Sequence, residues 1–450
     1  MFTGGVGGQF DSSRNAHKMH RECLILADSP GALVELCGIS ILERLLRTLQ
    51  RCGITRATVL SSTPRLIAEQ LAQPSWPRAQ LNLTVRNRPS GPVTVEQIVD
   101  VWPELAQKLL VLSGNAVFDY RLLPLVADQN SLAVLVDSAV PPRLQPLVSF
   151  APNTIRGKLC GAVLLTREWA LSQSGSLDQA LCRGLEQNSV ITLDVATQPS
   201  YSIMMHRELR PFWFPAPSQP NKKLAERVLL DAAQKGTLDF PAWVHAPIEN
   251  FLISHLCKTS ITPNQLTVFC NVIAWGTTIL FATGRLFWGI ALALIVGVLD
   301  GLDGKQARIK VETSKSGKLE HWFDAFFEIS WWTALAYHFH VSGQLPGAFR
   351  YLFLLLLAEG LDGIAKGSVY FAYGKSIDEL GPFERMVRLL GGRRNVYVWI
   401  LTVGLFLGAP AKAFIVMAWL EVATAAVHLP RAVWAVWVRQ HSARSKTLLA

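Results

Sequence analysis

The chain has 450 residues, of which 50% are hydrophobic and 17% are charged, and its formal net charge is +10. Soluble proteins carry about 25% charged residues on average, so this composition excludes one large soluble enzyme and a disordered chain. The composition also changes along the chain. Residues 1–245 read as a soluble region, whereas residues 265–440 contain apolar runs long enough to cross a bilayer, at about 20 residues each.

The start of the chain and its cysteines exclude further classes. The first 20 residues contain no apolar core, so we expect no cleavable signal peptide. The 7 cysteines form no CxxC pair, which disfavours a zinc ribbon or redox motif and predicts buried thiols in a reducing compartment. Basic residues gather beside the apolar runs, so we expect no nucleic-acid partner.

The first half of the chain alternates short apolar strands with helical segments. Strands are predicted at residues 23–27, 57–61, 81–87, 108–114 and 131–138. Residues 39–54, between the first two strands, have helical periodicity. This alternation predicts a doubly wound α/β domain at residues 21–205, after a flexible N-terminus at residues 1–20, with its crevice at the carboxyl ends of the strands.

Two segments of this domain resemble sugar-nucleotide-type nucleotidyltransferases. Pro30–Arg44 is similar to the family segment P-K-x-L-x-x-V-x-G-x-P-x-L-E-R, and Leu112–Asn115 is similar to the strand that ends in Gly-Asp. Asp194 stands where the family has a later metal-binding acid. The resemblance implies a nucleotide-binding α/β fold.

Three parts of the nucleotidyltransferase pattern are missing. Only Asp28 and Ser29 separate the first strand from Pro30, which leaves no room for the glycine-rich loop that cradles a triphosphate. Gly31 replaces the family's lysine and Asn115 replaces its metal-binding aspartate. Because transfer from CTP needs a metal and cations on the triphosphate, we expect an inactive domain. The alternative is an active domain that transfers a nucleotide from CTP.

The second half is predicted to be a transmembrane domain at residues 241–440, joined by a basic connector at residues 206–240. Residues 241–258 suit a helix that lies in the membrane interface. Six spans are predicted at residues 265–284, 286–302, 318–340, 347–370, 396–410 and 411–438. Lys and Arg gather in the loops after the second and fourth spans and in a cytoplasmic tail at residues 441–450. The positive-inside rule therefore places both termini and the site on the cytoplasmic side of the cell membrane.

Acidic residues are concentrated at the cytoplasmic ends of the second and third predicted spans. Asp300 and Asp303 are three residues apart and share a helix face, and Glu320, Asp324 and Glu328 are spaced by four on the next helix. Charges in such segments are costly and usually functional. Carboxylates that converge need a cation between them, and hard oxygen ligands suit Mg²⁺, Mn²⁺ or Ca²⁺.

The residues around these acids indicate the kind of substrate. Gly301 and Gly304 leave room for a ligand beside the helix backbone, and Lys305 and Arg308 supply cations for phosphates. This pattern predicts a metal-dependent site for a phosphorylated or nucleotide substrate. A proton or ion pathway is disfavoured, because proton relays do not require Gly and Arg at fixed offsets from the acids.

The same residues resemble the CDP-alcohol phosphotransferase family. Asp300–Arg308 (DGLDGKQAR) matches the first nine positions of its signature, D-x2-D-G-x2-A-R-x8-G-x3-D-x3-D, and Ile261–Thr267 is similar to its T-P-N-x-x-T segment. In the second half of the signature, the third acid falls on Glu320 and the fourth on Asp324, one residue early. Asp324 with Glu328 is the alternative assignment.

The resemblance implies transfer of a substituted phosphate from a CDP-alcohol to an acceptor hydroxyl, with release of CMP. It assigns Asp300, Asp303, Glu320 and Asp324 to one or two Mg²⁺ or Mn²⁺ ions, and Asp324 also to general base catalysis. It assigns the CDP pocket to Asn264, Gly304, Lys305, Ala307 and Arg308. Arg393 and Arg394 are expected either to hold a substrate phosphate or to be simple positive-inside flanking residues.

The partners follow from the same resemblance. The donor is CDP-diacylglycerol or a polar CDP-alcohol, the acceptor is a hydroxyl compound, membrane lipids surround the domain, and a homodimer is expected. Glu359, Asp362 and Lys366 share one face of the fourth predicted span, and we expect them to pair rather than to line a cavity. One alternative is a bifunctional enzyme whose N-terminal domain also makes the CDP-alcohol from CTP. A membrane transporter or a non-catalytic scaffold is the alternative of another class.

Overall fold

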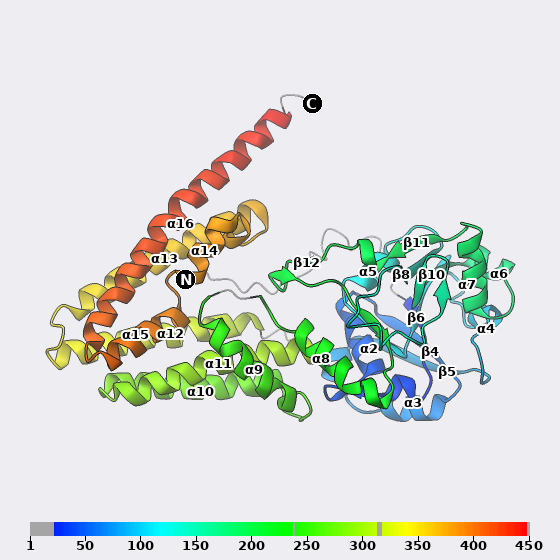
Figure 1. The fold of residues 1–450 in the computed structure, drawn as a ribbon, viewed down its shortest axis with the longest axis horizontal. Coiled ribbons are helices and arrows are strands. Elements are labelled where there is room, and N and C mark those ends of the chain that lie inside the picture. The colour runs from blue at the N-terminus through cyan, green and yellow to red at the C-terminus, as the bar shows by residue number, and fades with distance from the viewer. Residues whose placement is uncertain (1–21, 237–238, 313–316, 448–450) are drawn as a thin grey trace.

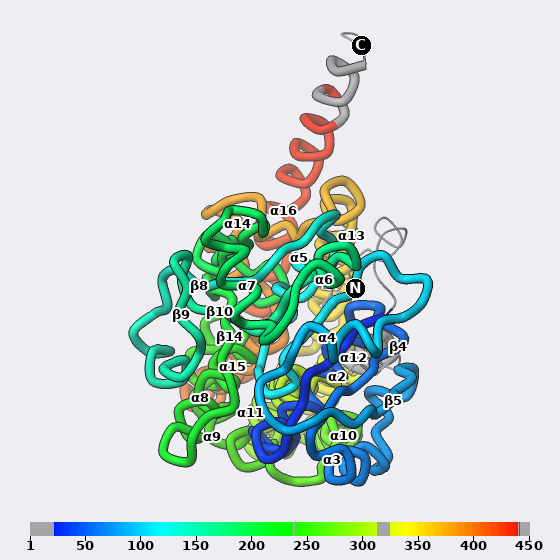
Figure 2. The backbone as a smooth tube through the Cα atoms, turned by 90° about the vertical axis from the view of Figure 1, so that its right-hand side faces the viewer, coloured from blue at the N-terminus to red at the C-terminus, as the bar shows by residue number. Residues whose placement is uncertain are grey.

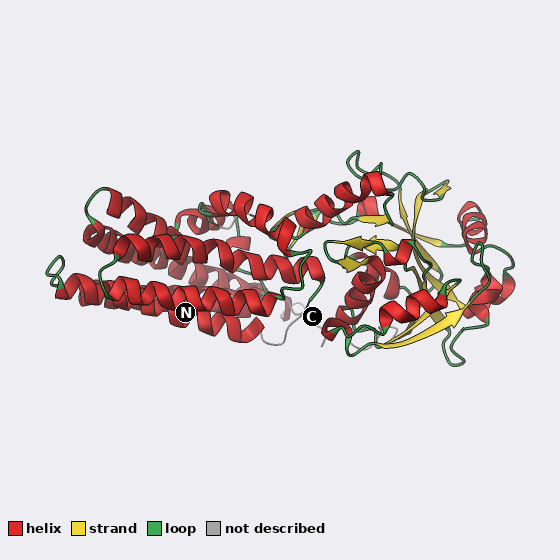
Figure 3. Cartoon of the chain, turned by 90° about the horizontal axis from the view of Figure 1, so that it is seen from below, coloured by secondary structure: helices red, strands yellow, loops and turns green. Residues whose placement is uncertain are grey.

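The computed structural model describes residues 22–236, 239–312 and 317–447, without the side chains of residues 317–324, 440 and 442–447. An α/β domain and a bundle of long helices occupy opposite ends of the molecule (Figure 1). Between them lie α8 (Lys222–Ala232) and α9 (Ala242–Leu256). Strands are confined to the first half of the chain, and the bundle within the described residues is helical (Figure 3).

The α/β domain is built on an eight-stranded sheet of order β11-β8-β10-β6-β1-β4-β5, with β9 paired to β10. Its strands are β1 (Glu22–Leu26), β4 (Arg56–Ser61), β5 (Asn82–Asn87), β6 (Lys108–Ser113), β8 (Ala133–Asp137), β9 (Asn153–Thr154), β10 (Gly157–Thr166) and β11 (Ile191–Asp194). β1 pairs in parallel with β4 and β6. The predicted strands and the parallel sheet are confirmed. β10, which runs antiparallel between β6 and β8, was not predicted.

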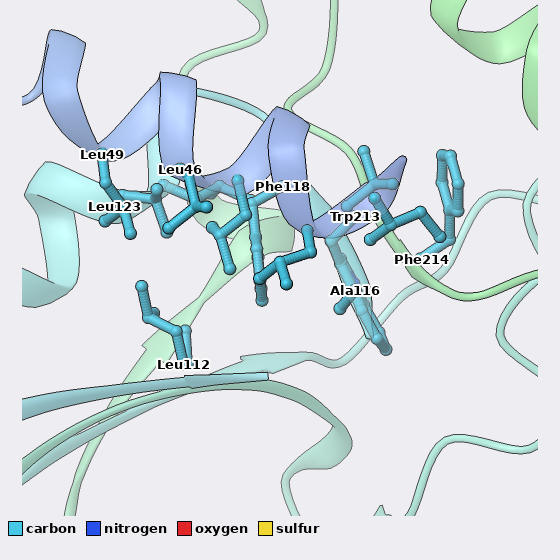
Figure 4. Packing of buried hydrophobic residues seen from close by; sticks show 14 of the residues in the cluster. Leu46, Leu49, Leu112, Ala116, Phe118, Leu123, Trp213 and Phe214 are labelled. Atoms are coloured by element: carbon cyan, nitrogen blue, oxygen red, sulfur yellow. The ribbon is translucent and has the colours of Figure 1, made fainter. Parts of the chain in front are cut away.

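Helices cover both faces of this sheet, as a doubly wound fold requires. One face packs on α2 (Ile41–Arg51), α5 (Leu122–Ala127) and α8, and the other packs on α4 (Val95–Val99), α6 (Arg167–Ser172) and α7 (Leu177–Glu186). Leu24 and Ile25 of β1 belong to opposite cores, because alternate side chains of a strand point to opposite faces. Figure 4 shows Leu46 and Leu49 of α2 above Leu112 of β6.

The predicted connector at residues 206–240 is folded onto the α/β domain over much of its length. β13 (Arg207–Glu208) pairs with β12 (Tyr201–Ser202), and β14 (Trp213–Pro215) pairs with β7 (Ala116–Phe118). The indole of Trp213 is buried and donates a hydrogen bond to Asp137 at 3.1 Å. Trp213 and Phe214 of the connector thus belong to the core of the α/β domain (Figure 4).

The helices of the second half coincide with the predicted apolar runs. They are α10 (Pro263–Ala282), α11 (Leu286–Lys310), α12 (Gly317–Val341), α13 (Ala348–Tyr373), α14 (Pro382–Leu390), α15 (Arg394–Phe406) and α16 (Pro410–Thr447). Among the described residues, α10, α11 and the Pro410–Arg439 part of α16 are long and apolar enough to cross a membrane. α15 is apolar but shorter, and α13 carries charged residues, so the count of six spans is not confirmed.

The bundle is apolar both inside and outside. Its core contains Trp331, Trp332, Phe339 and Phe414, all fully buried. Large apolar side chains also face outward along α10, at Val268, Phe269, Val272 and Trp275. Contiguous outward apolar surface of this kind marks contact with lipid or with another protein. The end of α16 projects beyond the rest of the molecule (Figure 2).

The two halves share one continuous core. Ile253 and Cys257 of α9 and its end, Leu266 of α10, and Leu302 and Ile309 of α11 belong to the same buried cluster as the residues of α2. An ion pair between Lys258 and Glu226 of α8, at 3.3 Å, lies at the same contact. The α/β domain is therefore packed directly against the C-terminal ends of α9 and α11, rather than attached only through a linker.

Candidate active site

α10 begins with a complete capping box. The Thr262 hydroxyl accepts from the Gln265 amide at 3.3 Å, and the Gln265 side chain accepts from the Thr262 amide at 2.9 Å. Pro263 occupies the first helical position, where it needs no hydrogen-bond partner. This start places Thr267 one turn into the helix, and the exposed Asn264 in the first turn. The T-P-N-x-x-T segment thus fixes the position of one hydroxyl.

Thr267 contacts the second acid of the signature. Its hydroxyl donates to Oδ2 of Asp303 at 2.7 Å, and Oδ1 of Asp303 accepts from the Gly304 amide at 2.5 Å. Asp303 is 5% exposed, and a buried carboxylate needs such donors because its desolvation is costly. Two sequence segments 36 residues apart therefore meet at one carboxylate.

Arg394, at the start of α15, holds the first acid. Its Nη2 lies 2.5 Å from Oδ2 of Asp300, and its guanidinium stands 5.0 Å from the ring centre of Phe327 on α12. The Asp300 side chain is 30% exposed, so it is reachable from solvent. Arg393, the other predicted phosphate-binding residue, directly precedes α15 without a side-chain hydrogen bond to the start of the helix. The basic loop after the fourth predicted span thus meets α11, the helix that carries Asp300 and Asp303.

Two cations expected at the CDP pocket are engaged by α8 and α9. The Lys305 ammonium is buried and lies 2.7 Å from Oε2 of Glu249 and 2.9 Å from Oδ1 of Asn250. Arg308 donates through Nε to the Ala233 carbonyl, just after α8, at 2.8 Å. These contacts, which were not predicted, fix the positions of both side chains. Their assignment to the CDP pocket, with that of Gly304, Ala307 and Asn264, stays a prediction.

α9 contributes residues to the site that sequence analysis missed. His245 and Glu249, one turn apart, lie against Gly297 and Gly301 of α11. A Cβ atom on Gly301 would stand 2.5 Å from Oε1 of Glu249, and one on Gly297 would stand 2.9 Å from Cε1 of His245. Burial lowers the pKa of His245, which favours the neutral ring. Their spacing of four within the predicted interfacial helix was the signal that could have identified them.

Glu320 and Asp324 lie on α12, but their side chains are outside the described residues. Glu328, one turn beyond Asp324, is half-buried. The choice between the Glu320–Asp324 pair and the Asp324–Glu328 pair therefore stays a prediction. In the part of the chain that is described, no group of three or more His, Cys, Asp or Glu residues is arranged to hold a metal ion. Asp300 and Asp303 themselves offer carboxylate oxygens, which fit a hard divalent cation.

A second polar cluster lies deeper in the bundle. Asp362 pairs with Lys366 on α13 and accepts a hydrogen bond from His428 of α16. The Tyr397 hydroxyl on α15 donates to Glu421 of α16. The expected pairing of Asp362 with Lys366 is confirmed. Each pair satisfies charges or hydroxyls that would be costly if left alone in an apolar bundle.

The carboxyl edge of the α/β sheet is occupied by contacts within the domain. Asp28 accepts from the Ser62 amide at 2.7 Å and pairs with Arg88. The Asn115 side chain accepts from the Asp28 amide at 3.1 Å, and a Cβ atom on Gly31 would lie 3.0 Å from that side chain. Burial opposes ionisation of Asp28, but the hydrogen bonds from Ser62 and the charge of Arg88 outweigh it and lower its pKa.

Comparisons with known proteins cover both halves. Residues 260–372 match the model of the CDP-alcohol phosphatidyltransferase family. The helical half carries a CDP-alcohol phosphatidyltransferase domain. The matched range contains Thr262, Thr267, Asp300, Asp303 and Arg308, which include the pair joined by the Thr267–Asp303 hydrogen bond. With this domain and the three long apolar helices found among the described residues, the chain is a membrane protein.

Two curated relatives carry the name bifunctional IPC transferase and DIPP synthase. The protein from Rubrobacter xylanophilus is 26% identical over 426 residues, which cover 88% of this chain and 89% of the relative. The protein from Aquifex aeolicus is 26% identical over 218 residues, which cover 46% of this chain and 47% of the relative.

Two solved structures resemble one half of the chain each. The inositol-1-phosphate CTP transferase from T. maritima is 12% identical, with a TM-score of 0.33, over 47% of this chain and 96% of its own. The phosphatidylinositol phosphate synthase from Mycobacterium tuberculosis with CDP-DAG bound is 20% identical, with a TM-score of 0.33, over 44% of this chain and 94% of its own.

Proposed function

We propose that the CDP-alcohol phosphatidyltransferase domain transfers a substituted phosphate group from a CDP-alcohol to an acceptor hydroxyl and releases CMP. The observation that carries this proposal is the hydrogen bond from Thr267 to Asp303, which joins the two family segments at one buried carboxylate. A transporter or scaffold needs no such arrangement of a hydroxyl, two acids and an arginine at the start of the neighbouring helix.

Asp300, Asp303, Glu320 and Asp324 are the residues that would hold one or two Mg²⁺ or Mn²⁺ ions. When bound, a divalent ion neutralises the phosphate oxygens and the leaving CMP. Asp324 takes the proton of the acceptor hydroxyl. In the same step the hydroxyl oxygen bonds to the β-phosphorus, and the bond between that phosphorus and the oxygen of the leaving CMP breaks. Thr267 orients Asp303, and Arg394 holds Asp300 within reach of the donor phosphates.

Gly304, Ala307, Arg308, Lys305 and Asn264 are proposed to line the CDP pocket. The signature positions support this assignment, and the contacts of Lys305 with Glu249 and of Arg308 with the Ala233 carbonyl hold both cations beside α11. The donor is CDP-diacylglycerol or a polar CDP-alcohol. Arg393 and Arg394 are proposed to bind a phosphate of the donor or acceptor.

The setting of the site is also part of the proposal. Six spans, with both termini and the site on the cytoplasmic side of the cell membrane, fit the distribution of Lys and Arg. α9 supports an interfacial position, because Trp243, Ile248 and Phe251 are exposed on its outer side while His245 and Glu249 face α11. A homodimer within the lipid bilayer is proposed from the family resemblance.

We propose that the α/β domain does not transfer nucleotides, because Asp28, Arg88 and Asn115 occupy the edge where a triphosphate would bind. A bifunctional enzyme is the second candidate. The observation that favours it is the Rubrobacter xylanophilus relative, whose name is bifunctional and whose match covers 88% of this chain.

The proposal predicts a loss of CMP release in acid variants. The full chain, reconstituted with Mg²⁺ and a panel of CDP-alcohols and acceptor alcohols, should release CMP. Asp303→Asn and Asp324→Asn should each lower kcat at least about a hundredfold, since a metal-binding or proton-accepting carboxylate is lost. Asp100→Asn, an exposed carboxylate of the α/β domain, is the control and should match the unsubstituted protein.

Two results would contradict the proposal. Full CMP release by Asp324→Asn would remove that residue as the base. No CMP release by the unsubstituted protein with any donor and acceptor pair would overturn the proposed reaction itself. Size-exclusion chromatography of each variant shows whether it is folded.

A further inference from the structure

Two buried arginines of the α/β domain reach the C-terminal end of α11, the helix that carries Asp300 and Asp303. Arg44 and Arg47 lie three residues apart on α2 and are 5% and 8% exposed. Nη1 of Arg47 donates to the Lys310 carbonyl at 2.7 Å, and Nη1 of Arg44 donates to the Ile309 carbonyl. Both acceptors belong to the last turn of α11. The soluble domain therefore supplies the hydrogen-bond donors at this helix end.

This contact has a clear physical basis. The last four carbonyls of a helix lack partners within the helix, and the C-terminal end carries partial negative charge. α11 ends at Lys310, and Val311 after it has left-handed backbone with φ of 52°. The amides of Val311 and Glu312 turn back to the carbonyls of Arg308 and Ala307, whereas the carbonyls of Ile309 and Lys310 accept from the two arginines. Guanidinium groups satisfy both needs, because they donate hydrogen bonds and carry positive charge.

Both arginines are themselves held in place. Arg44 donates a further hydrogen bond to the Leu36 carbonyl at 3.0 Å. Arg47 pairs with Glu43 at 2.8 Å within α2 and with Glu312, just beyond α11, at 3.3 Å. Both guanidinium groups are thus held in fixed positions between α2 and α11 and are not mobile surface charges.

The capped end lies close to the candidate active site on the same rigid element. Lys310 is seven residues beyond Asp303, which is two turns or about 10 Å along a helix. α11 also leads into α12, which carries Glu320 and Asp324. A shift or rotation at the end of α11 would therefore be transmitted to Asp300 and Asp303.

We propose that the α/β domain helps to position the phosphotransferase site. Arg44 and Arg47 fix the end of α11, so that Asp303 keeps its contact with Thr267 and Asp300 keeps its contact with Arg394. Arg44 and Arg47 are positioning residues, since they contact neither acid. This inference rests on the proposed function. It gives the α/β domain a role in the membrane reaction that requires no nucleotide in its own crevice.

The test compares Arg47→Ala, Arg44→Ala and Arg47→Lys with Arg78→Ala in the full chain, reconstituted in lipid nanodiscs. Arg78 is the matched control, because it pairs with Glu43 at 2.7 Å and is as buried as Arg47, but its hydrogen bonds go to Leu71 and Gln73 rather than to α11. CMP release is measured against Mg²⁺ and donor concentration. Hydrogen exchange of residues 300–310 is measured on the same samples.

Arg47→Ala should lower kcat about ten- to hundredfold, as expected for a small misplacement of catalytic groups, and should raise the Mg²⁺ concentration needed for half-maximal rate. Its KM for the donor should change less than its kcat. Arg47→Lys keeps a positive charge and a group that can donate to the Lys310 carbonyl, so it should recover part of the rate. Residues 300–310 should exchange faster in Arg47→Ala than in Arg78→Ala.

Equal kcat, Mg²⁺ dependence and exchange in folded Arg47→Ala and Arg78→Ala would overturn the positioning role, even if Arg47→Ala melts at a lower temperature. If Arg44→Ala does not fold, the comparison of Arg47→Ala with Arg78→Ala still tests the positioning role. If the unsubstituted protein releases no CMP, the proposed function fails, whereas the exchange of residues 300–310 still tests whether the arginines hold α11.

Discussion

At the scale of single residues, the candidate site depends on which partner holds each charge. Asp303 is buried and accepts from Thr267, and Asp300 is paired with Arg394. The sequence predicted both acids, because their spacing is local to one helix. It did not predict that Glu249 holds Lys305, because that contact joins residues 56 positions apart on separate helices.

The Thr267 hydroxyl offers a sharp test at this scale. Thr267→Val keeps the shape but removes the donor to Asp303, and a hydrogen bond to a charged group contributes about 1.5–3 kcal/mol. We expect kcat for CMP release to fall about ten- to hundredfold and the Mg²⁺ requirement to rise. Thr267→Ser should retain most of the activity. Wild-type kinetics in Thr267→Val would show that the hydroxyl does not orient Asp303.

At the scale of elements, α9 and α11 show how much the pattern of residues along a helix predicts and what it leaves out. The sequence predicted an interfacial helix at residues 241–258 and an acid-bearing span after it, and both helices are present. Gly301 was expected, with Gly304, to leave room for a ligand, yet it admits Glu249 of α9, and Gly297 one turn earlier admits His245. Periodicity reveals a face of small residues, whereas the partner of that face is set by packing.

The turn between β2 (Glu35–Leu36) and β3 (Ile39–Ser40) tests the packing of elements. Gly38 has φ of 80°, and a Cβ atom there would lie 2.1 Å from the Cys257 carbonyl oxygen at the end of α9. Gly38→Ala should destabilise the protein by more than the about 1–3 kcal/mol of left-handed strain alone. Gly91→Ala is the control, because Gly91 has φ of 114° and open space around it. Thermal unfolding midpoints that fall equally in both variants would show that the turn is not pressed against α9.

At the scale of the whole molecule, the α/β domain and the bundle form one packed unit. The shared core and the contacts of α2 with α11 join them. This arrangement agrees with the proposal that the α/β domain serves the membrane reaction without transferring nucleotides itself. β14 and α8, which lie within the predicted connector at residues 206–240, complete the α/β core.

The full chain should release no pyrophosphate from CTP with Mg²⁺ and a panel of alcohol phosphates. The reason is that Asp28 and Arg88 are paired with each other and Asn115 replaces a metal-binding acid. Pyrophosphate release is measured with and without each alcohol phosphate. Turnover that disappears in Asp194→Asn would instead establish the bifunctional enzyme and assign the second activity to this domain.

The resemblance to the CDP-alcohol phosphotransferase family predicted the reaction class. The sequence by itself determined the α/β and helical halves and the shared helix face of Asp300 and Asp303. These properties depend on composition and on spacings within one helix or strand, which local backbone geometry converts directly into shared faces. The tertiary structure decided the partners of Lys305, Arg308 and Asp300, and the capping of α11 by Arg44 and Arg47. Those contacts join segments far apart in the chain, and their geometry exists only once the two halves pack together.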